Sequence, residues 1–255
     1  MITIKTLEEI KILREGGKIL TSVLFEVAGK VRSGISTIEL DELAEKLIRK
    51  NKGEPSFKNY KTRDDKFPYP ASLCVSINDE IVHGIPLRDK ILKEGNIVSL
   101  DLGMKYKNLY TDMAVTVRVG EISKKAEKLI KITKKCLEEG IKKIKPKNYI
   151  GDIGFAVQNC AEKNGFNVVK RLVGHGVGYQ VHEDPEIPNF GQPKTGIQLK
   201  TGMVLALEPM VVEGNPDIIL DKDNWTWKTK DGLLSAHFEH TVVVTRNGAE
   251  ILTKI

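Results

Sequence analysis

Four acidic residues end or begin apolar runs in a pattern that occurs twice. In residues 95–101, and again in residues 202–208, a glycine opens an apolar run that ends in an acid. A second acid, Asp112 in the first copy and Glu239 in the second, opens the next apolar run. If two related halves fold face to face, the four acids meet between them. Clustered carboxylates repel one another unless cations neutralise them, so the pattern predicts a metal site.

The first pair of acids, Asp101 and Asp112, lies between two strand-like runs. An antiparallel hairpin turning near Tyr106–Lys107 would place the two side chains opposite each other, with Cβ atoms roughly 4.5–5.5 Å apart. Glu208 and Glu239 repeat the arrangement with a longer connection. Four ionised carboxylates would be neutralised by two divalent cations. The sequence therefore predicts a dinuclear centre.

The few histidines fall in or beside these strands. Glycines flank His175, and His182 follows seven residues later, an odd spacing that puts the two on opposite faces of a strand. We therefore do not assume that both bind one ion. His237 and His240 are better interpreted as packed or surface residues. Carboxylates with one imidazole suit Mn, Fe(II), Co or Zn, and paired ions about 3.5–4 Å apart activate water in hydrolases.

The elements that position these residues are predicted from apolar periodicity and capping signals. A helix over 6–31 begins with a capping box at Thr6 and Glu9, and a second begins at Ser36 with Glu39. The predicted helices of the second half span 123–144 and 150–164. Strands are predicted over 71–82, 96–102, 113–119, 166–182, 203–213 and 236–245. The order is helix, helix, strands, twice.

The composition indicates an ordinary globular chain. It has 255 residues, of which 40% are hydrophobic, and no Pro/Gly/Ser-rich linker separates the two copies. We predict one catalytic domain, 1–255, with pseudo-symmetric halves of about 1–120 and 121–255. There is no apolar run of 18 residues and no signal peptide, so neither a membrane span nor secretion is expected. Three widely spaced cysteines favour reduced thiols and a cytoplasmic location.

Lysine dominates the basic residues. The net charge is +6, and residues 124–147 hold ten lysines against three glutamates. The simpler interpretation is a solvated helix face. The alternative is a weak, salt-sensitive contact with RNA, such as a ribosome surface. We expect no DNA partner.

Taken together, the motifs resemble those of the type I methionine aminopeptidases. The resemblance covers the chain from Ile4 to Thr245. It rests on the order and spacing of five residues, Asp101, Asp112, His175, Glu208 and Glu239, with Val-His-Gly-Ile-Pro upstream and Gly-His-Gly-Val-Gly-x-x-x-His between them. It implies the pseudo-two-fold "pita-bread" α/β (α+β) fold, an antiparallel sheet flanked by two pairs of helices. It also implies a cytoplasmic monomer that removes the N-terminal methionine of nascent polypeptides when the second residue is small.

The resemblance implies a role for each of these residues. Asp101 would bind one of two ions, His175 and Glu208 the other, and Asp112 and Glu239 would bridge both. His83 and His182 would contact the scissile peptide, His182 nearer its carbonyl oxygen and His83 nearer its amide nitrogen. Glu208 would also carry the proton from the attacking water to the leaving amine.

A pocket for the methionine side chain follows from the same resemblance. Its positions match Tyr69, Cys74 and Trp225, although ordinary core packing would also account for these residues. Two positions depart from the family pattern. Val181 stands where bacterial relatives often carry phenylalanine, so the pocket is expected to be roomier, and Leu172 stands where an aromatic residue or methionine is favoured. These departures bear on selectivity and leave the ligands untouched.

Two other functions share some of these features. An X-Pro aminopeptidase or prolidase shares the fold and ligands but usually carries an N-terminal domain of more than a hundred residues, for which this chain has no room. An inactive paralogue that binds RNA or protein would have lost ligands, and all five are present.

The length of the chain between two motifs bears on the type of enzyme. Only 26 positions separate His182 from Glu208, too few for the helical insertion of type II enzymes. No zinc-binding or linker extension is recognised before Ile4, so we expect a chain that resembles the short bacterial form.

Overall fold

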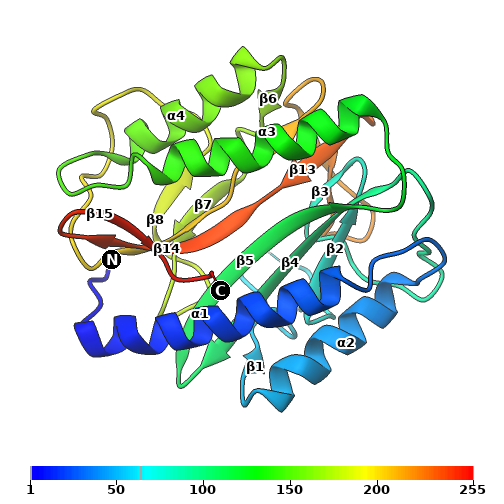
Figure 1. Ribbon diagram of the computed structural model, residues 1–255, viewed down its shortest axis with the longest axis horizontal. Coiled ribbons are helices and arrows are strands. Elements are labelled where there is room, and N and C mark those ends of the chain that lie inside the picture. Colours follow the sequence, from blue (N-terminus) through cyan, green and yellow to red (C-terminus); the bar gives the residue numbers. More distant parts are fainter. Residues whose placement is uncertain (1, 64, 255) are drawn as a thin grey trace.

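The computed structural model describes residues 2–63 and 65–254. Helices α1 (Leu7–Ala28) and α2 (Thr37–Lys50) precede the strands of the first half, and α3 (Lys124–Ile141) and α4 (Ile150–Lys163) precede those of the second. Each predicted helix is found within about three residues of its expected ends. Figure 1 shows α3 and α4 toward the top of the view and α1 and α2 toward the bottom, with the long strands running diagonally between them. The predicted order of elements is confirmed.

The first two helices begin where the capping boxes predicted. The Thr6 hydroxyl accepts the Glu9 backbone N–H at 3.3 Å, and the Glu9 carboxylate accepts the Thr6 N–H at 2.7 Å. At α2, the Glu39 carboxylate accepts the Ser36 N–H at 2.9 Å. These bonds satisfy backbone donors that have no partner inside a helix. The caps therefore fix where each helix starts.

A nine-stranded sheet, all of whose pairs are antiparallel, forms the centre of the molecule. Its main path runs β1–β4–β5–β14–β9–β7–β8, with β2 paired to β4 and β15 paired to β14. The strands are β1 (Glu54–Pro55), β2 (Leu73–Ile77), β4 (Ile97–Tyr106), β5 (Leu109–Arg118), β7 (Val173–Gly176), β8 (Glu183–Pro188), β9 (Val204–Leu207), β14 (Glu239–Thr245) and β15 (Gly248–Ile251). Since β5 pairs with β14, strands from both halves share one sheet.

Two small three-stranded sheets complete the fold. One has the order β13–β10–β6 and the other β11–β12–β3. Their strands are β3 (Glu80–Val82), β6 (Asn167–Val168), β10 (Met210–Val212), β11 (Ile218–Leu220), β12 (Trp227–Thr229) and β13 (Ser235–His237). The predicted strand over 71–82 is thus two strands, and the one over 166–182 is two short strands followed by turns. Strands β1, β8, β11, β12 and β15 were not predicted.

The internal repeat is visible in individual hydrogen bonds. The N–H of Gly95 donates to Val119 O at 3.0 Å, and the N–H of Gly202 donates to Val244 O at 2.9 Å. Both glycines have a positive φ, +85° and +90°, a conformation that a side chain would strain. The same turn therefore opens the central ladder of each half.

The ladders that follow these turns can be compared position by position. Asp101 corresponds to Glu208, as predicted. Asp112 is paired with Gly103, and the corresponding pair of the second half is His237 with Met210. Glu239 corresponds to Ala114, the residue opposite Asp101. The prediction that Glu239 repeats Asp112 in register is therefore wrong by two residues.

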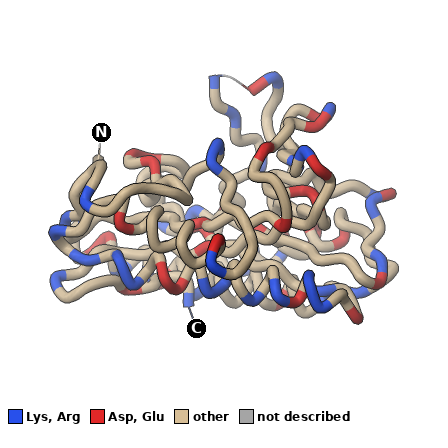
Figure 2. The backbone as a smooth tube through the Cα atoms, turned by 90° about the horizontal axis from the view of Figure 1, so that it is seen from above, with Lys and Arg blue, Asp and Glu red and all other residues tan. Residues whose placement is uncertain are grey.

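The helices pack their apolar faces onto one face of the sheet. Leu20 and Leu24 of α1 are fully buried in one cluster with Leu100 and Leu102 of β4. Figure 2 shows loops projecting from the opposite side of the molecule. None of the described helices combines the length and the apolar character needed to cross a bilayer.

Candidate metal centre and substrate cavity

The β4–β5 hairpin turns at Lys107 and Asn108, whose φ angles are +47° and +66°. Two consecutive positive φ angles are typical of the two-residue turns that match the twist of a hairpin. Tyr106 therefore pairs with Leu109, and Asp112 lies opposite Gly103 instead of Asp101. The predicted pairing of the two aspartates is wrong because the turn lies one residue later than expected. Their spacing along the ladder still directs both side chains to one face.

A row across three strands brings acids of the two halves together. Asp101 of β4 pairs with Ala114 of β5, and Ala114 pairs with Glu239 of β14. The small side chain of Ala114 leaves the space between the two acids open. Glu208 comes directly after β9, where Pro209 cannot donate a ladder hydrogen bond. These acids therefore meet where the two halves join.

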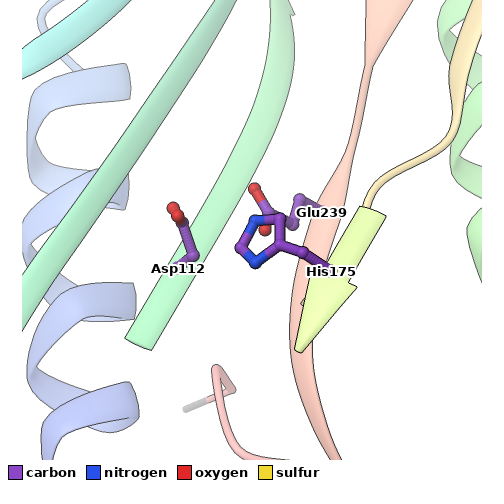
Figure 3. A group of neighbouring side chains, drawn as sticks. All are labelled: Asp112, His175 and Glu239. Atoms are coloured by element: carbon purple, nitrogen blue, oxygen red, sulfur yellow. The ribbon is translucent and has the colours of Figure 1, made fainter. Parts of the chain in front are cut away.

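His175 completes the cluster from β7. Donor atoms of Asp112, His175 and Glu239 all lie within 4.8 Å of one another, and the three side chains are buried. Figure 3 shows the imidazole and the Glu239 carboxylate side by side, with Asp112 across from them. The His175 Nε2 also lies 3.5 Å from Glu208 Oε1.

The tautomer of His175 follows from its backbone contact. Its Nδ1 lies 2.8 Å from Gly176 O, and because a carbonyl can only accept, Nδ1 carries the proton. The unprotonated Nε2 therefore faces the acids, as a metal ligand requires. Burial also lowers the pKa of His175 to about 3, which keeps the ring neutral.

Burial makes ionised carboxylates unfavourable in this cluster. It raises the pKa of Asp112 to about 7. Burial first, and the neighbouring acids second, raise the pKa values of Asp101, Glu208 and Glu239 well above their ordinary range. Asp101 Oδ1 and Glu239 Oε1 are buried, and no described residue gives them a hydrogen bond. Unpaired buried oxygen atoms are costly, so this donor set fits a divalent cation.

A cavity of about 460 Å³ contains the cluster. Every residue predicted for the site lines it: Tyr69, Cys74, His83, Asp101, Asp112, His175, His182, Glu208, Trp225 and Glu239. At one end the rings of Tyr69 and Trp225 meet edge to face at 5.2 Å. Cys74 and Val181 belong to the same buried apolar cluster. The cavity therefore joins an apolar end to an acidic one.

His182 and His83 lie beside the acids in different ways. His182 follows the turn at Gly178, where φ is +141°, so the spacing rule for a continuous strand does not apply. Its ring centroid lies 4.4 Å from that of His175, and its Nδ1 lies 2.6 Å from the Tyr60 hydroxyl. His83 follows β3 with a φ of +59°, which is uncommon for a residue with a side chain. Both imidazoles are thus brought to the rim of the cluster.

Tyr60 and His237 contact residues of the cluster or its rim and were not predicted as site residues. Tyr60 comes from a loop without a motif, and nothing in the sequence marks it. His237 is buried, with its Nε2 3.6 Å from Glu208 Oε2. His240, by contrast, packs as expected, with its Nδ1 3.0 Å from Thr253 Oγ1. An alignment of the two copies of the repeat in register could have identified His237, since this residue occupies the position that matches Asp112.

A second cavity of about 680 Å³ adjoins the first and shares His83, Arg171, His175, His182 and Glu208 with it. Leu172 and Met210 line this cavity. The acid and histidine cluster therefore lies where the two cavities meet.

Comparison with known proteins agrees with this arrangement. Residues 11–246 match the family described as metallopeptidase family M24. The chain belongs to this family. It is 48% identical to the methionine aminopeptidase of Clostridium perfringens, and the match covers all of both chains. These comparisons place it among the methionine aminopeptidases of family M24.

Solved structures of the M24 fold show the same relationship. The crystal structure of methionine aminopeptidase from Thermotoga maritima is 45% identical, with a TM-score of 0.96 over all of both chains. The prolidase of Pyrococcus furiosus is 24% identical, with a TM-score of 0.77 over 99% of this chain and 65% of its own. The prolidase therefore shares the fold only. The predicted pita-bread fold is confirmed.

Proposed function

We propose that this chain removes the N-terminal methionine from peptides and nascent proteins whose second residue is small. The observation that carries the proposal is the single cavity in which acids of both halves, three histidines and an apolar pocket meet. Full-length identity to methionine aminopeptidases supports it. We further propose that the chain is one catalytic domain, active as a monomer in the cytoplasm, where nascent chains emerge.

The proposed cofactor is a pair of divalent ions, Mn, Fe(II), Co or Zn. Asp101 would hold one ion, His175 and Glu208 the other, and Asp112 and Glu239 both. The short distances among Asp112, His175 and Glu239 support this set. When bound, such ions lower the pKa of water and polarise a carbonyl.

The side chains around the ions carry the rest of the proposed mechanism. The Glu208 carboxylate takes a proton from the attacking water and gives it to the leaving amine. His182 donates to the oxygen of the scissile carbonyl as negative charge develops there. The Tyr60 hydroxyl at its Nδ1 holds the His182 ring in place. His83 contacts the amide nitrogen of the same bond.

The apolar end of the cavity is the proposed site for the methionine side chain. Tyr69 and Trp225 provide two aromatic walls at a fixed angle, and Cys74 provides a small polarizable contact. The hydroxyl of Tyr69 donates to Gly84 O at 3.0 Å, which keeps that polar group away from the substrate. An unbranched thioether is the side chain that this pocket suits.

Peptide specificity tests the proposal. We expect protein loaded with Mn²⁺ under anaerobic conditions to release methionine from Met-Ala-Ser and not from Met-Lys-Ser, because the larger second residue would not fit beside the histidines. Ala-Pro peptides serve as the control for an X-Pro activity. Efficient cleavage of Ala-Pro with none of Met-Ala-Ser would overturn the proposal and favour the X-Pro alternative. The metal content of anaerobically purified protein identifies the ion.

Contact with the ribosome through residues 124–147 is a separate proposal. All ten lysines of this segment are exposed, although Lys125 pairs with Glu213 and Lys142 with Glu139. Figure 2 shows basic residues spread over the surface, with acidic ones among them. Cosedimentation with ribosomes should weaken as salt rises and be lost when Lys131, Lys134 and Lys135 are changed to Glu. Binding that ignores both changes would exclude this contact.

A further inference from the structure

His237 is a buried histidine without a hydrogen-bond partner, and it lies beside a residue of the active site. Only 1% of its side chain is exposed. Across the described parts of the chain, nothing forms a hydrogen bond with either ring nitrogen. An unsatisfied buried polar group costs about 1–3 kcal/mol. A histidine that only filled space here would therefore be unfavourable compared with an apolar residue.

The position of His237 in the internal repeat indicates a role in the site. It pairs with Met210 as Asp112 pairs with Gly103, so both residues direct their side chains to the same face of their ladders. In the first half this position supplies an acid to the cluster. In the second half it supplies an imidazole that lies against Glu208.

The two oxygen atoms of Glu208 face two different imidazoles. Oε1 lies 3.5 Å from Nε2 of His175, and Oε2 lies 3.6 Å from Nε2 of His237. The His175 Nε2 has no proton, because its Nδ1 donates to Gly176 O. It therefore cannot donate to Glu208. The His237 ring has no such partner, so its Nε2 is free to carry a proton and point it at Oε2.

His237 also lies behind the site. Neither cavity has it among its described lining residues, whereas Glu208 lines both. It can therefore act on the reaction through Glu208 and not by contact with the substrate. Carboxylates that bind metals are generally held by a further hydrogen bond from the protein, and loss of that bond typically costs 10–100-fold in metal affinity or activity.

We infer that His237 is a positioning residue. Its Nε2 lies 3.6 Å from Oε2 of Glu208, and a small shift of the carboxylate brings the two into a hydrogen bond, donated by Nε2–H, that fixes the orientation of Glu208. With Oε2 held, Oε1 stays directed at the space in front of His175. The inference rests on the proposed function of Glu208 as ligand and proton carrier. It adds an imidazole at the position of the second half that matches Asp112.

Two variants of similar volume separate the hydrogen bond from packing. His237→Gln keeps an N–H donor that can reach Glu208, and His237→Met has none. We expect the Met variant to lower kcat on Met-Ala-Ser about 10–100-fold with little change in KM, and to weaken the lower-affinity Mn²⁺ site by a similar factor in calorimetric titration. We expect His237→Gln to recover most of both losses. His240→Gln changes a partly buried histidine that is paired to Thr253; it is the control and should behave as wild type.

Thermal unfolding verifies that each variant is folded. If the Met variant does not fold, His237→Asn, whose amide is too short to reach Oε2, replaces it. Wild-type kcat and Mn²⁺ affinity in the Met variant, or in the Asn variant that replaces it, would overturn the inference, as would losses equal to those of the Gln variant. A wild-type protein that releases no methionine would refute the proposed function instead. The Mn²⁺ titration would still test His237 in that case, because it requires no turnover.

Discussion

The two halves of the molecule share the same arrangement of strands but carry different side chains at matching positions. In the first half, Asp101 and Asp112 come from one uninterrupted hairpin, β4–β5. In the second half, the matching ladder is broken into β9 and β10 on one side and β13 and β14 on the other, with its register kept. The second half also adds His175 from β7. Duplication thus fixed the geometry of the ladders, and substitution at matching positions determined the chemistry.

The break in the second ladder has a local cause and a consequence. Pro209 interrupts the hydrogen bonding directly after Glu208, and Phe238 separates β13 from β14. Glu208, the acid that matches Asp101, therefore lies at a strand end and lines both cavities, while Asp101 itself lies in mid-strand. A strand end suits the role proposed for Glu208, that of a metal ligand that also carries a proton.

Removal of one acid from each half should give the largest effects. We expect Asp101→Asn and Glu208→Gln each to lower kcat/KM by about 10²–10⁴-fold, Asp101→Asn through loss of an ion and Glu208→Gln through loss of a ligand and the proton carrier. Peptide assays and elemental analysis measure both. Unchanged metal stoichiometry in Asp101→Asn would contradict its assignment as a ligand.

His182→Ala tests the histidine that only the second half supplies. We expect kcat to fall about 10²–10³-fold, as for loss of one donor to a developing oxyanion, with metal content unchanged. Tyr60→Phe, which removes only the hydroxyl at Nδ1, should give a smaller loss in the same parameter. Loss of bound metal in His182→Ala would show that this residue acts as a ligand instead.

The stability of metal-stripped protein should depend on pH through the buried acids. Burial raises the folded-state pKa of Asp112 from 3.8 to about 7, so the folded protein binds the extra proton between these values. The stability that the protonated Asp112 contributes is full below about pH 4 and is lost as the pH rises to about 7. Asp112→Asn replaces the carboxyl with a group that does not titrate, so the variant does not lose this stability. The variant should therefore gain on the order of 2–4 kcal/mol relative to wild type across that range.

Urea unfolding in EDTA at pH 4.5 and pH 8 measures this gain. The comparison of variant with wild type cancels the opposite contribution of the buried histidines, such as His175, whose pKa is lowered. A stability difference that is the same at both pH values would show that Asp112 does not titrate as described.

Val181→Phe should have the smallest effect and acts on the pocket alone. Val181 is buried in one cluster with Tyr69 and Trp225, so a larger ring there narrows the apolar end. We expect preference for methionine over its one-carbon-longer homologue ethionine to rise about tenfold, the order expected for one methylene group. Competition between Met-Ala-Ser and the ethionine peptide measures this. An unchanged ratio would place Val181 outside the pocket.

Much of this molecule could be predicted from local signals. The capping boxes at Thr6 and Ser36 and the apolar stripes fix the helices, because both act within a few residues. The glycines at 95 and 202 mark the turns of the repeat, because their backbone conformation excludes side chains. The acids that end apolar strands followed from the same pattern. Strands such as β8, β11 and β12 lacked such signals, since their pairing comes from distant parts of the chain.

What the sequence determined by itself is the set of reactive side chains and the repeat that carries them, since both depend on residue type and spacing. Tertiary structure decided which of them meet. A turn one residue later set Asp112 against Gly103 and not Asp101, and the turn at Gly178 brought His182 back to His175. The pairing of β5 with β14 placed Glu239 in the same row as Asp101, and continued register placed His237 behind Glu208. These contacts join residues far apart in the chain, where no local propensity acts and only packing selects the partner.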